Sequence, residues 1–549
     1  MSVISQELFS SLGAEKVDVS PEPRMDTSNF RNEFSAVITP TCVDDVIEAV
    51  KSAGRHKFSL YPVSTGKNWG YGSSLAPQTG SVLLDLSQLK AISDFDDELG
   101  LITIEPGVTQ QQLYDFLTER NADYIVPVTG GGPNCSIIGN AIERGFGLAP
   151  YSDHFGAVVS LQAVLANGDV YSSPMADGRP SYFKWGIGPY LDGLFCQGAH
   201  GVVTRMTITL ARRPERTGLF LFQVKEEKNL DQVIKAIREL VATGFGGVGG
   251  LQLMNDVRIL AMSGMSDDAE NSGDMLTQKR IAELAQSTGL APWVGLGTYY
   301  GAREIAASAK TLIKRVLRPH VDRLIFVDAP RLKFVRTILG VLPKSRLTRL
   351  RESIGRVQEI LDWVGGVPTE MGLLMAYWKS KRTTPKKDLD PARDRCGLYW
   401  YAPVMPMLSG KVDEFIRMVK EICGKHRFEA PINLVSMEGG YAFCSTLPLL
   451  FSADDEEQNE RARACYGELF KEGVAKGFIP YRIGSQYMDL MPTACNDVYW
   501  RLNESLKQAT DPDRIIAPGR YCERDPASIT GASDSQEYSR GAKVNNTPV

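Results

Sequence analysis

A glycine-rich run, residues 66–72 (GKNWGYG), has the residue types of a loop that binds an anion. The apolar stretch before it, Phe58–Tyr61, predicts a strand. Because glycine adopts positive φ angles readily, a loop of this kind can turn successive backbone N–H groups toward a phosphate. Tyr71 lies between two glycines, so we expect its side chain to face the molecule that carries that phosphate.

A second glycine-rich stretch covers residues 130–147 (GGGPNCSIIGNAIERGFG). Three glycines precede a short helical pattern that Ser136 could cap, and a helix start presents N–H groups to a pyrophosphate. The spacing is not G-x-G-x-x-G after a strand of a βαβ unit, so a Rossmann nucleotide site is disfavoured. A tight turn without a ligand would explain either loop alone, but two such loops in one region favour a phosphate site.

Four polar residues could act on a substrate. Asp153, in a glycine-flanked loop, could accept a proton. The adjacent Tyr481 and Arg482, and Arg520 near the C-terminus, could stabilise an oxyanion. Taken singly, each has a more ordinary interpretation: a turn carboxylate, a packed tyrosine, a surface ion pair or a helix cap.

The composition excludes several classes of protein. A formal charge of −4 gives no reason to expect a nucleic-acid or anionic-membrane partner, and no apolar run approaches the roughly 20 residues of a membrane span. The nine cysteines occur singly and the five histidines lack metal-ligand spacing, so we expect no metal site and a reducing compartment. The N-terminus lacks a secretory-signal pattern. We therefore expect a cytoplasmic protein.

Alternating apolar runs and helical patterns predict an α+β fold. Residues 34–215 combine strands with helices such as 43–54 and 109–121, and Asn167-Gly168 predicts a hairpin turn. Residues 216–499 predict a second domain, a sheet with covering helices. We expect 1–33 to be an N-terminal extension and 523–549 to be a disordered tail. The polar segment 379–395 is expected to be an exposed loop.

Together these motifs resemble the vanillyl-alcohol oxidase family of flavoenzymes, which share the p-cresol methylhydroxylase fold. The family's G-(R/K)-N-x-G-Y-G motif is matched by residues 66–72, and its N-x-x-(D/E)-R-G-x-G-Y-x-P-Y-x-(D/E)-H motif by residues 140–154, with Leu148 in place of a tyrosine. The stretch 185–195, the Tyr481-Arg482 pair and Ile516–Arg520 complete five matches in the family's order. The resemblance covers about residues 35–521. It implies a two-part FAD-binding domain of the p-cresol methylhydroxylase type at 34–215, a cap domain of antiparallel sheet with covering helices at 216–499, and a return of 500–522 to the FAD-binding domain.

The resemblance further implies FAD as the cofactor, held by both glycine-rich loops and by the segment that starts at residue 201. The residues expected to bind it are Ser64, Thr65, Gly66, Lys67, Asn68, Gly70, Tyr71, Gly72, Gly131, Gly132, Ser136, Gly139, Asn140, Arg144, Gly145, Tyr151, Gly201, Val202, Val203 and Arg520.

The subgroup that the chain resembles most oxidises para-alkylphenols. In that subgroup, Tyr71, Tyr481, Arg482 and Arg520 would hold a small phenolic substrate as its phenolate, and Asp153 would be the carboxylate near flavin N5. A hydride would pass from the benzylic carbon to N5 and leave a quinone methide, with an alcohol or aldehyde as product. Two alternatives stay open: a same-fold oxidase or dehydrogenase of a hydroxy acid, sugar or amine, and a flavin-binding protein without turnover.

The chain departs from the family where the flavin is often attached and at one pocket wall. The attaching histidine would fall near Leu398, and the tyrosine alternative near Ala376, one place from Tyr377. We therefore expect non-covalent FAD, with a link to Tyr377 as the minority case. The family's His-His pair corresponds to Gly440-Tyr441, which we expect to alter the pocket wall. The family also implies a homodimer or higher homo-oligomer, with oxygen, a quinone or a cytochrome partner as electron acceptor.

Overall fold

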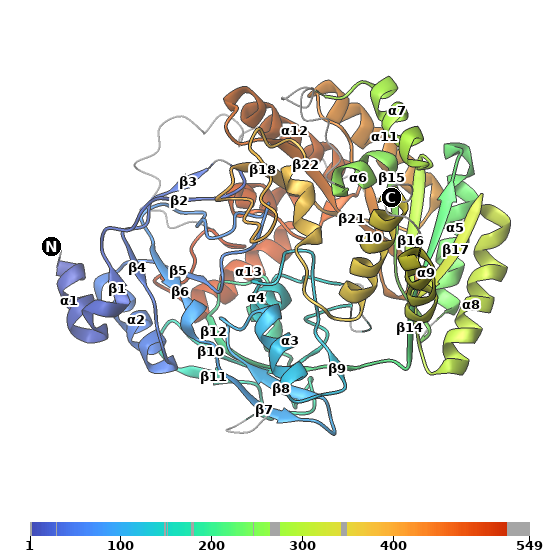
Figure 1. Ribbon diagram of the computed structural model, residues 1–549. Helices are drawn as coiled ribbons and strands as arrows, with labels where there is room; N and C mark the ends of the chain where they lie inside the picture. Colours follow the sequence, from blue (N-terminus) through green and yellow to red (C-terminus); the bar gives the residue numbers. More distant parts are fainter. Residues whose placement is uncertain are drawn as a thin grey trace.

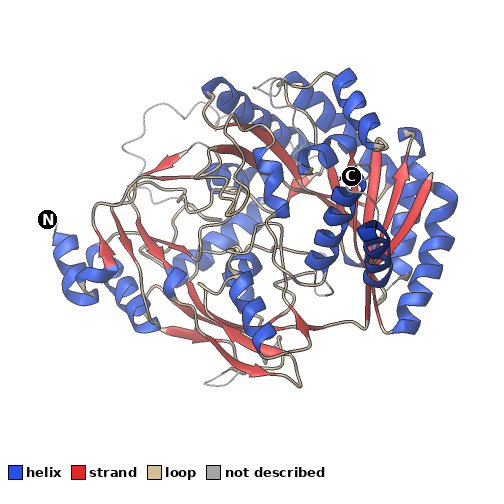
Figure 2. Ribbon diagram, in the orientation of Figure 1, coloured by secondary structure: helices blue, strands red, loops and turns tan. Residues whose placement is uncertain are grey.

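The computed structural model describes residues 3–523 apart from Asn29, 148–149, Tyr151, 177–180, Phe245, 264–274 and 342–347. One half of the protein holds two small sheets, and the other half holds one large sheet covered by helices (Figure 1, Figure 2). This confirms the α+β class expected from the sequence. Of the predicted tail, 523–549, residues 524–549 lie outside the described residues.

The first glycine-rich loop leaves the carboxyl end of a strand in a four-stranded sheet. The sheet order is β1 (Val17–Asp18), β4 (Ala36–Ile38), β6 (Val82–Asp85) and β5 (Leu60–Val63), in which β4, β6 and β5 are parallel. Helices α1 (Val3–Leu12) and α2 (Val43–His56) pack beside it. The apolar face of α2, with Val46, Ala49 and Val50, is fully buried in the same core as the strands.

The second glycine-rich loop belongs to a five-stranded antiparallel sheet with two helices. Its order is β11 (Val170–Ser172), β10 (Val158–Val164), β12 (Val202–Thr209), β8 (Leu101–Ile104) and β7 (Ile92–Asp96). Asn167-Gly168 forms the predicted turn between β10 and β11. Thr109 caps α3 (Gln110–Glu119) with a full capping box, and Ser136 Oγ accepts from Gly139 N at the start of α4 (Ile137–Ile142). A short pair, β9 (Tyr124–Ile125) and β13 (Ala211–Arg212), lies beside this sheet.

The cap contains an eight-stranded antiparallel sheet. Its order is β17 (Arg323–Asp328), β14 (Arg216–Val224), β16 (Trp293–Gly301), β15 (Val248–Asn255), β20 (Asn433–Ser436), β21 (Ala442–Ser445), β19 (Pro403–Pro406) and β23 (Ile479–Pro480). Glycines on β16 leave room for phenylalanines on β14. Phe222 pairs with Gly295, and a Cβ on that glycine would lie 1.9 Å from the Phe222 ring.

Helices cover both faces of the cap sheet. Four helices pack against the sheet in the main core of the cap: α5 (Leu230–Thr243), α8 (Arg303–Leu317), α11 (Ser409–Lys425) and α12 (Glu456–Ala475). A separate core forms around α9 (Ala329–Val341) and α10 (Thr348–Val364). Helix α6 (Asp256–Met262), helix α7 (Gln278–Thr288) and the ribbon of β18 (Cys396–Tyr401) and β22 (Leu447–Ser452) complete the cap (Figure 1). A small hairpin, β2 (Arg24–Met25) and β3 (Arg31–Asn32), also belongs to the described chain.

The chain returns to its first sheet after α13 (Asp497–Thr510). Leu60 N donates to Ile515 O at 2.6 Å, and Ala517 N donates to Leu60 O at 2.8 Å, so the last described segment runs beside β5. A buried ion pair anchors the return, with Lys507 Nζ 2.5 Å from Asp511 Oδ2.

The expectation that 379–395 is an exposed loop is wrong in part. Lys379 is buried and pairs with Glu429 at 2.6 Å, and Leu389 is also buried. The segment's polar composition hid these contacts, because its charged side chains find partners within the protein. No helix of the described residues is long and apolar enough to cross a bilayer. None of the His, Cys, Asp and Glu side chains searched in this part of the chain form a group of three that could hold a metal ion.

The return segment gives a first prediction. Asp511→Asn keeps the shape of the side chain but leaves the Lys507 ammonium buried without a counter-charge, so stability should fall by about 3–5 kcal/mol. Thermal unfolding should show a melting temperature several degrees lower. The exposed pair Lys57–Asp513 is the matched control, and Asp513→Asn should leave the melting temperature unchanged. Equal shifts in both variants would contradict the assigned role.

Candidate active site

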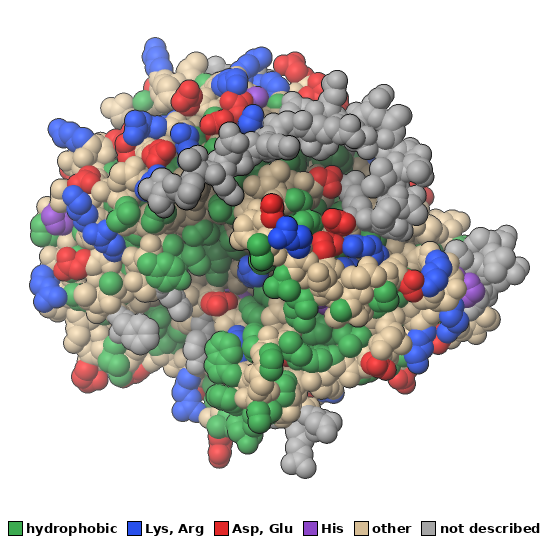
Figure 3. All heavy atoms as spheres, turned by 180° about the vertical axis from the view of Figure 1, so that it is seen from behind, with side chains coloured by type: hydrophobic (Ala, Val, Ile, Leu, Met, Phe, Trp, Pro, Cys, Tyr) green, Lys and Arg blue, Asp and Glu red, His purple; other side chains and the backbone are tan. Residues whose placement is uncertain are grey.

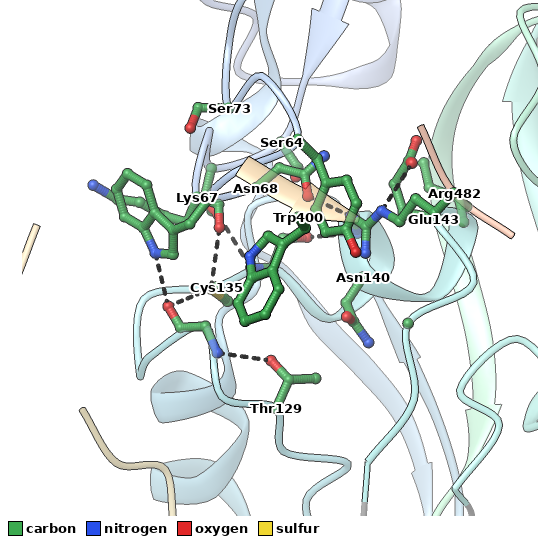
Figure 4. A pocket seen from close by; sticks show the side chains of 18 of the residues that line it. Ser64, Lys67, Asn68, Ser73, Thr129, Cys135, Asn140, Glu143, Trp400 and Arg482 are labelled. Atoms are coloured by element: carbon green, nitrogen blue, oxygen red, sulfur yellow. Dashed lines mark hydrogen bonds and ion pairs between the residues drawn. The ribbon is translucent and has the colours of Figure 1, made fainter. Parts of the chain in front are cut away.

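A cavity lies where the two glycine-rich loops meet the cap. Its lining includes residues 64–69, most of 129–147, the sheet residues Gln252, Asn433 and Val435, and Trp400 of β18. In the view of Figure 4, the Trp400 ring lies between Cys135 on one side and Arg482 with Glu143 on the other. Apolar side chains gather over the middle of the back of the molecule, with acidic and basic side chains around them (Figure 3).

Two arginines at one end of the cavity share one carboxylate. Arg482 Nε lies 3.4 Å from Glu143 Oε2, and Arg520 Nη2 donates to Glu143 Oε1. Arg520 also donates to the Tyr61 hydroxyl at 2.9 Å and to Ser485 Oγ at 3.2 Å. Burial disfavours the charge on Arg482, but the Glu143 carboxylate outweighs it and the pKa of Arg482 is raised. Two cations and one anion leave this end with one excess positive charge.

Two tyrosine hydroxyls lie beside this charge. The Arg482 guanidinium is 4.3 Å from the centre of the Tyr71 ring, and the Tyr481 ring packs against Phe146 at 5.6 Å. Burial raises the pKa of both tyrosines well above the usual value. Both hydroxyls therefore stay protonated at neutral pH and can donate hydrogen bonds to an anionic oxygen.

The two glycine-rich loops contact each other directly. Ser136 N donates to Thr65 Oγ1 at 3.1 Å, and the Trp69 indole donates to Gly131 O at 3.0 Å. Gly139 is required at this contact, because a Cβ there would lie 2.4 Å from Ser64 Oγ. The loops therefore form one continuous wall of the cavity.

This wall fits the diphosphate of FAD. Gly66 has a φ of 66°, and within the described residues the backbone N–H groups of Gly66, Lys67 and Asn68 donate to no acceptor. Such free N–H groups in a glycine loop form an anion-binding concavity. The cavity then extends beneath the cap, with room for a ring system between the loops and the sheet. The free N–H groups and the shape of this cavity therefore fit FAD.

Most of the residues expected to bind the cofactor line this cavity. They are Ser64, Thr65, Gly66, Lys67, Asn68, Tyr71, Gly131, Ser136, Gly139, Asn140, Gly145, Gly201, Val203 and Arg520. Gly70 and Gly72 instead face Trp400 and Ser485, which would lie 2.4 and 2.8 Å from an added Cβ. Gly132 contacts Leu373, and the Val202 side chain points into the core of the first sheet. Tyr151 lies outside the described residues.

The placement of Asp153 and Arg144 corrects two expectations. Asp153 is exposed, outside the cavity lining, and its carboxylate accepts from Gly156 N at 2.8 Å as in an ordinary turn. Arg144 is exposed with a φ of 54°. Glu143, the residue before Arg144, lines the cavity in its place.

His154 supports the second loop from behind. Its Nδ1 lies within hydrogen-bond distance of the Asn140 amide, which lines the cavity. Burial lowers the pKa of His154 to about 4, so the imidazole is neutral at pH 7.

Two further expectations about the cap change. The Tyr377 hydroxyl donates to Asp394 at 2.6 Å and does not line the cavity, whereas Ala376 does. Tyr441 is 69% exposed and therefore does not form the pocket wall. The wall at the inner strand consists of Asn433 and Val435.

The sequence analysis did not single out several of the lining residues, among them Glu143, Arg258 and Trp400. Glu143 lies inside a motif, and the presence of two arginines expected at one oxyanion could have suggested a counter-ion. Arg258 and Trp400 come from the cap, whose residues approach the loops only through the tertiary fold.

Two family models match the chain. One, described as an FAD binding domain, matches residues 34–173, and the other, described as the C-terminal domain of FAD linked oxidases, matches residues 407–521. A relative from Chondromyces crocatus, 1'-carboxy-chondrochloren decarboxylase, is 36% identical over 517 residues, or 92% of this chain and 94% of the relative. The 4-cresol dehydrogenase (hydroxylating) flavoprotein subunit of Pseudomonas putida is 27% identical over 511 residues, or 90% and 89% of the two chains.

Solved structures share the whole fold. A p-cresol methylhydroxylase with bound substrate superposes with a TM-score of 0.81 at 24% identity, over 95% of this chain and 96% of the other. The 4-ethylphenol oxidase of Gulosibacter chungangensis, in its isoeugenol complex, gives a TM-score of 0.80 at 22% identity, over 95% and 97%. At these identities the likeness establishes the fold.

The buried histidine gives a second prediction, on pH. Because the folded-state pKa of His154 is depressed, its contribution to stability is present above the unfolded pKa of about 6.5 and is lost as pH falls toward 4. Between pH 7 and pH 5 the loss should be about 2 kcal/mol. Urea unfolding of His154→Gln should show lower stability at pH 7 but a shallower decline to pH 5. A decline as steep as in the unsubstituted protein would contradict this.

Proposed function

Since this chain belongs to the vanillyl-alcohol oxidase and p-cresol methylhydroxylase family of flavoproteins, we propose that it oxidises the benzylic carbon of a para-substituted phenol. The observation that supports this most is the cluster of Tyr71, Tyr481, Arg482 and Arg520 around Glu143. It offers two hydroxyl donors and one excess positive charge to a single oxygen. A phenolate has the charge and the acceptor capacity that this cluster lacks.

The protein's contribution in this proposal is to bind, orient and ionise the phenol. Tyr71 and Tyr481 donate to the phenol oxygen, and the Arg482–Glu143–Arg520 group favours its anionic form. Donors and a nearby positive charge lower such a pKa by about 1–3 units. Phenolate charge makes the benzylic carbon a better hydride donor, and holding the ring in one orientation contributes further to the rate. FAD, when bound, supplies the hydride acceptor.

The cofactor would be held by the two glycine-rich loops. Free N–H groups of residues 66–68 would bind its diphosphate, with Ser64, Thr65 and Asn140 beside it. We propose that FAD is bound without a covalent link, because the cavity has Ala376 and Leu398 where an attaching side chain would stand.

A second candidate is decarboxylation, which is the activity in the name of the relative from Chondromyces crocatus. The observation of this chain that favours it is a buried arginine, Arg258, in the cavity lining. Assays with carboxylated phenols that follow carbon dioxide release together with flavin reduction would separate the two activities.

The assembly expected from the family, a homo-oligomer with a cytochrome as one possible electron acceptor, is also a proposal. The name of the relative from Pseudomonas putida describes a flavoprotein subunit, which supports a second chain in that protein. Reoxidation rates of the reduced enzyme by air and by cytochrome c would distinguish the acceptors.

The phenolate-binding role gives a third prediction. Tyr481→Phe removes one donor to the phenol oxygen and should lower kcat/KM for 4-alkylphenols by roughly 100-fold, the usual effect of losing one oxyanion donor, while FAD stays bound. Arg520→Ala should lower it at least as far. The exposed Tyr441 is the matched control, and Tyr441→Phe should leave turnover unchanged. Normal turnover in both active-site variants would exclude phenolate stabilisation.

The mode of flavin attachment gives a fourth prediction. After precipitation with trichloroacetic acid, the yellow colour should remain in the supernatant, because only non-covalent contacts would hold FAD. Tyr377→Phe should give the same result, since its hydroxyl is occupied by Asp394. A coloured pellet that turns colourless in Tyr377→Phe would instead establish the tyrosine link.

A further inference from the structure

The cavity contains a further buried cation that the phenolate-binding cluster does not use. Arg258 lies on helix α6 of the cap and is 6% exposed. Arg258 contacts Thr446 and the Trp400 ring. Arg482, by contrast, lies over the Tyr71 ring, so the two charges act on different parts of the cavity.

Arg258 differs from the other buried cations in having no carboxylate partner. Among the described residues, four lysine or arginine side chains are classed as buried. Lys379 pairs with Glu429, Lys507 with Asp511 and Arg482 with Glu143. No ion pair joins Arg258 to a described acid. Because an uncompensated buried charge is costly, its retention in a cavity wall indicates a ligand of opposite charge.

The surroundings of Arg258 leave most of its donors available. Nη1 donates to Thr446 O at 3.2 Å, the guanidinium lies 5.4 Å from the centre of the Trp400 ring, and Nε has no hydrogen-bond partner. A guanidinium has five N–H donors, and only one is engaged in this way. Gln252 and Asn433 are the neutral polar side chains that line the same cavity from the cap sheet.

We propose that Arg258 binds a carboxylate on the para side chain of the substrate. This inference rests on the proposed function, which places the phenol oxygen at Tyr71, Tyr481 and Arg482. The Trp400 ring, which contacts both Arg258 and the first glycine-rich loop, would then lie along the substrate between its two ends. The planar fork of arginine matches the two oxygens of a carboxylate, and the dry surroundings strengthen that pair.

The consequence is a preference for acidic phenols. A substrate with a neutral side chain would remove water from the Arg258 guanidinium without giving it an anionic partner. Such a substrate should therefore bind more weakly than an acidic one. The discrimination comes from a group that is already buried in the protein, and it needs no movement of the cap.

The test is a binding measurement that requires no turnover. (4-Hydroxyphenoxy)acetate and (4-hydroxyphenoxy)acetamide have the same length and differ in charge, and an ether oxygen replaces the benzylic carbon, so neither can be oxidised there. Isothermal titration calorimetry on the FAD-loaded protein should give about 10- to 100-fold tighter binding of the acetate. The same comparison with an acid and an amide whose side chains are one methylene longer extends the test to a longer substrate.

Variants assign this preference to one residue. Arg258→Met should abolish the preference by weakening the binding of the acetate while leaving the binding of the acetamide unchanged. Arg258→Gln is a smaller perturbation and should give the same result if the methionine variant does not fold. Arg238, which donates to Met407 O outside the cavity, is the matched control, and Arg238→Met should keep the full preference. Equal binding of acid and amide by the unsubstituted protein, or an equal loss of both in the variants, would overturn the proposal. Loss of benzylic oxidation with an intact preference would instead refute the proposed function alone.

Discussion

The sharing of one carboxylate by two arginines is the interaction on which the active-site end of the cavity depends. Without Glu143, the guanidinium groups of Arg482 and Arg520 would repel each other in surroundings of low polarity. The same contact determines more than charge. Arg520 donates to Ser485 Oγ, and Ser485 N donates to the carbonyl of Tyr71, so the acid fixes the loop that presents the tyrosine. Glu143 therefore both offsets the charge of the two arginines and fixes the position of Tyr71 at this end of the cavity.

The two halves of the chain contribute different parts of the cavity and are joined where they meet. The first half provides backbone groups, through glycines that leave N–H donors unused. The cap provides large or charged side chains, such as Trp400 and Arg258. Contacts across the boundary hold both in place: Lys67 pairs with Asp390 at 2.6 Å, and Trp400 N donates to Gly70 O at 3.3 Å. The backbone N–H groups of the first half suit the binding of a cofactor, and the side chains of the cap suit discrimination between substrates.

Features set by neighbouring residues could be predicted from the sequence, and features set by the tertiary fold could not. The caps at Thr109 and Ser136 and the turn at Asn167-Gly168 depend on hydrogen bonds or φ angles within a few residues. Among the expectations that the structure corrects, those for Asp153, Arg144 and Tyr441 concern the direction in which a loop side chain points, which a motif does not specify. Glu143 escaped notice because its role depends on an arginine 377 positions later in the chain. The family motifs still identified the loops and the α+β fold, because those matches rest on spacing.

The return of the C-terminal segment to β5 has a consequence for how the protein is made. Arg520 reaches the cavity only because the segment around Ile516 pairs with Leu60 of strand β5, which comes much earlier in the chain. During translation, β5 and its loop leave the ribosome long before the arginine that completes the charge cluster is synthesised. Domains tend to fold from the N-terminus as they emerge. The edge strand β5 of the first sheet therefore stays unpaired until the segment around Ile516 has been synthesised. The site can therefore form only after this segment has been synthesised, and nascent chains that stop short of it would carry glycine loops without the Arg520 cation.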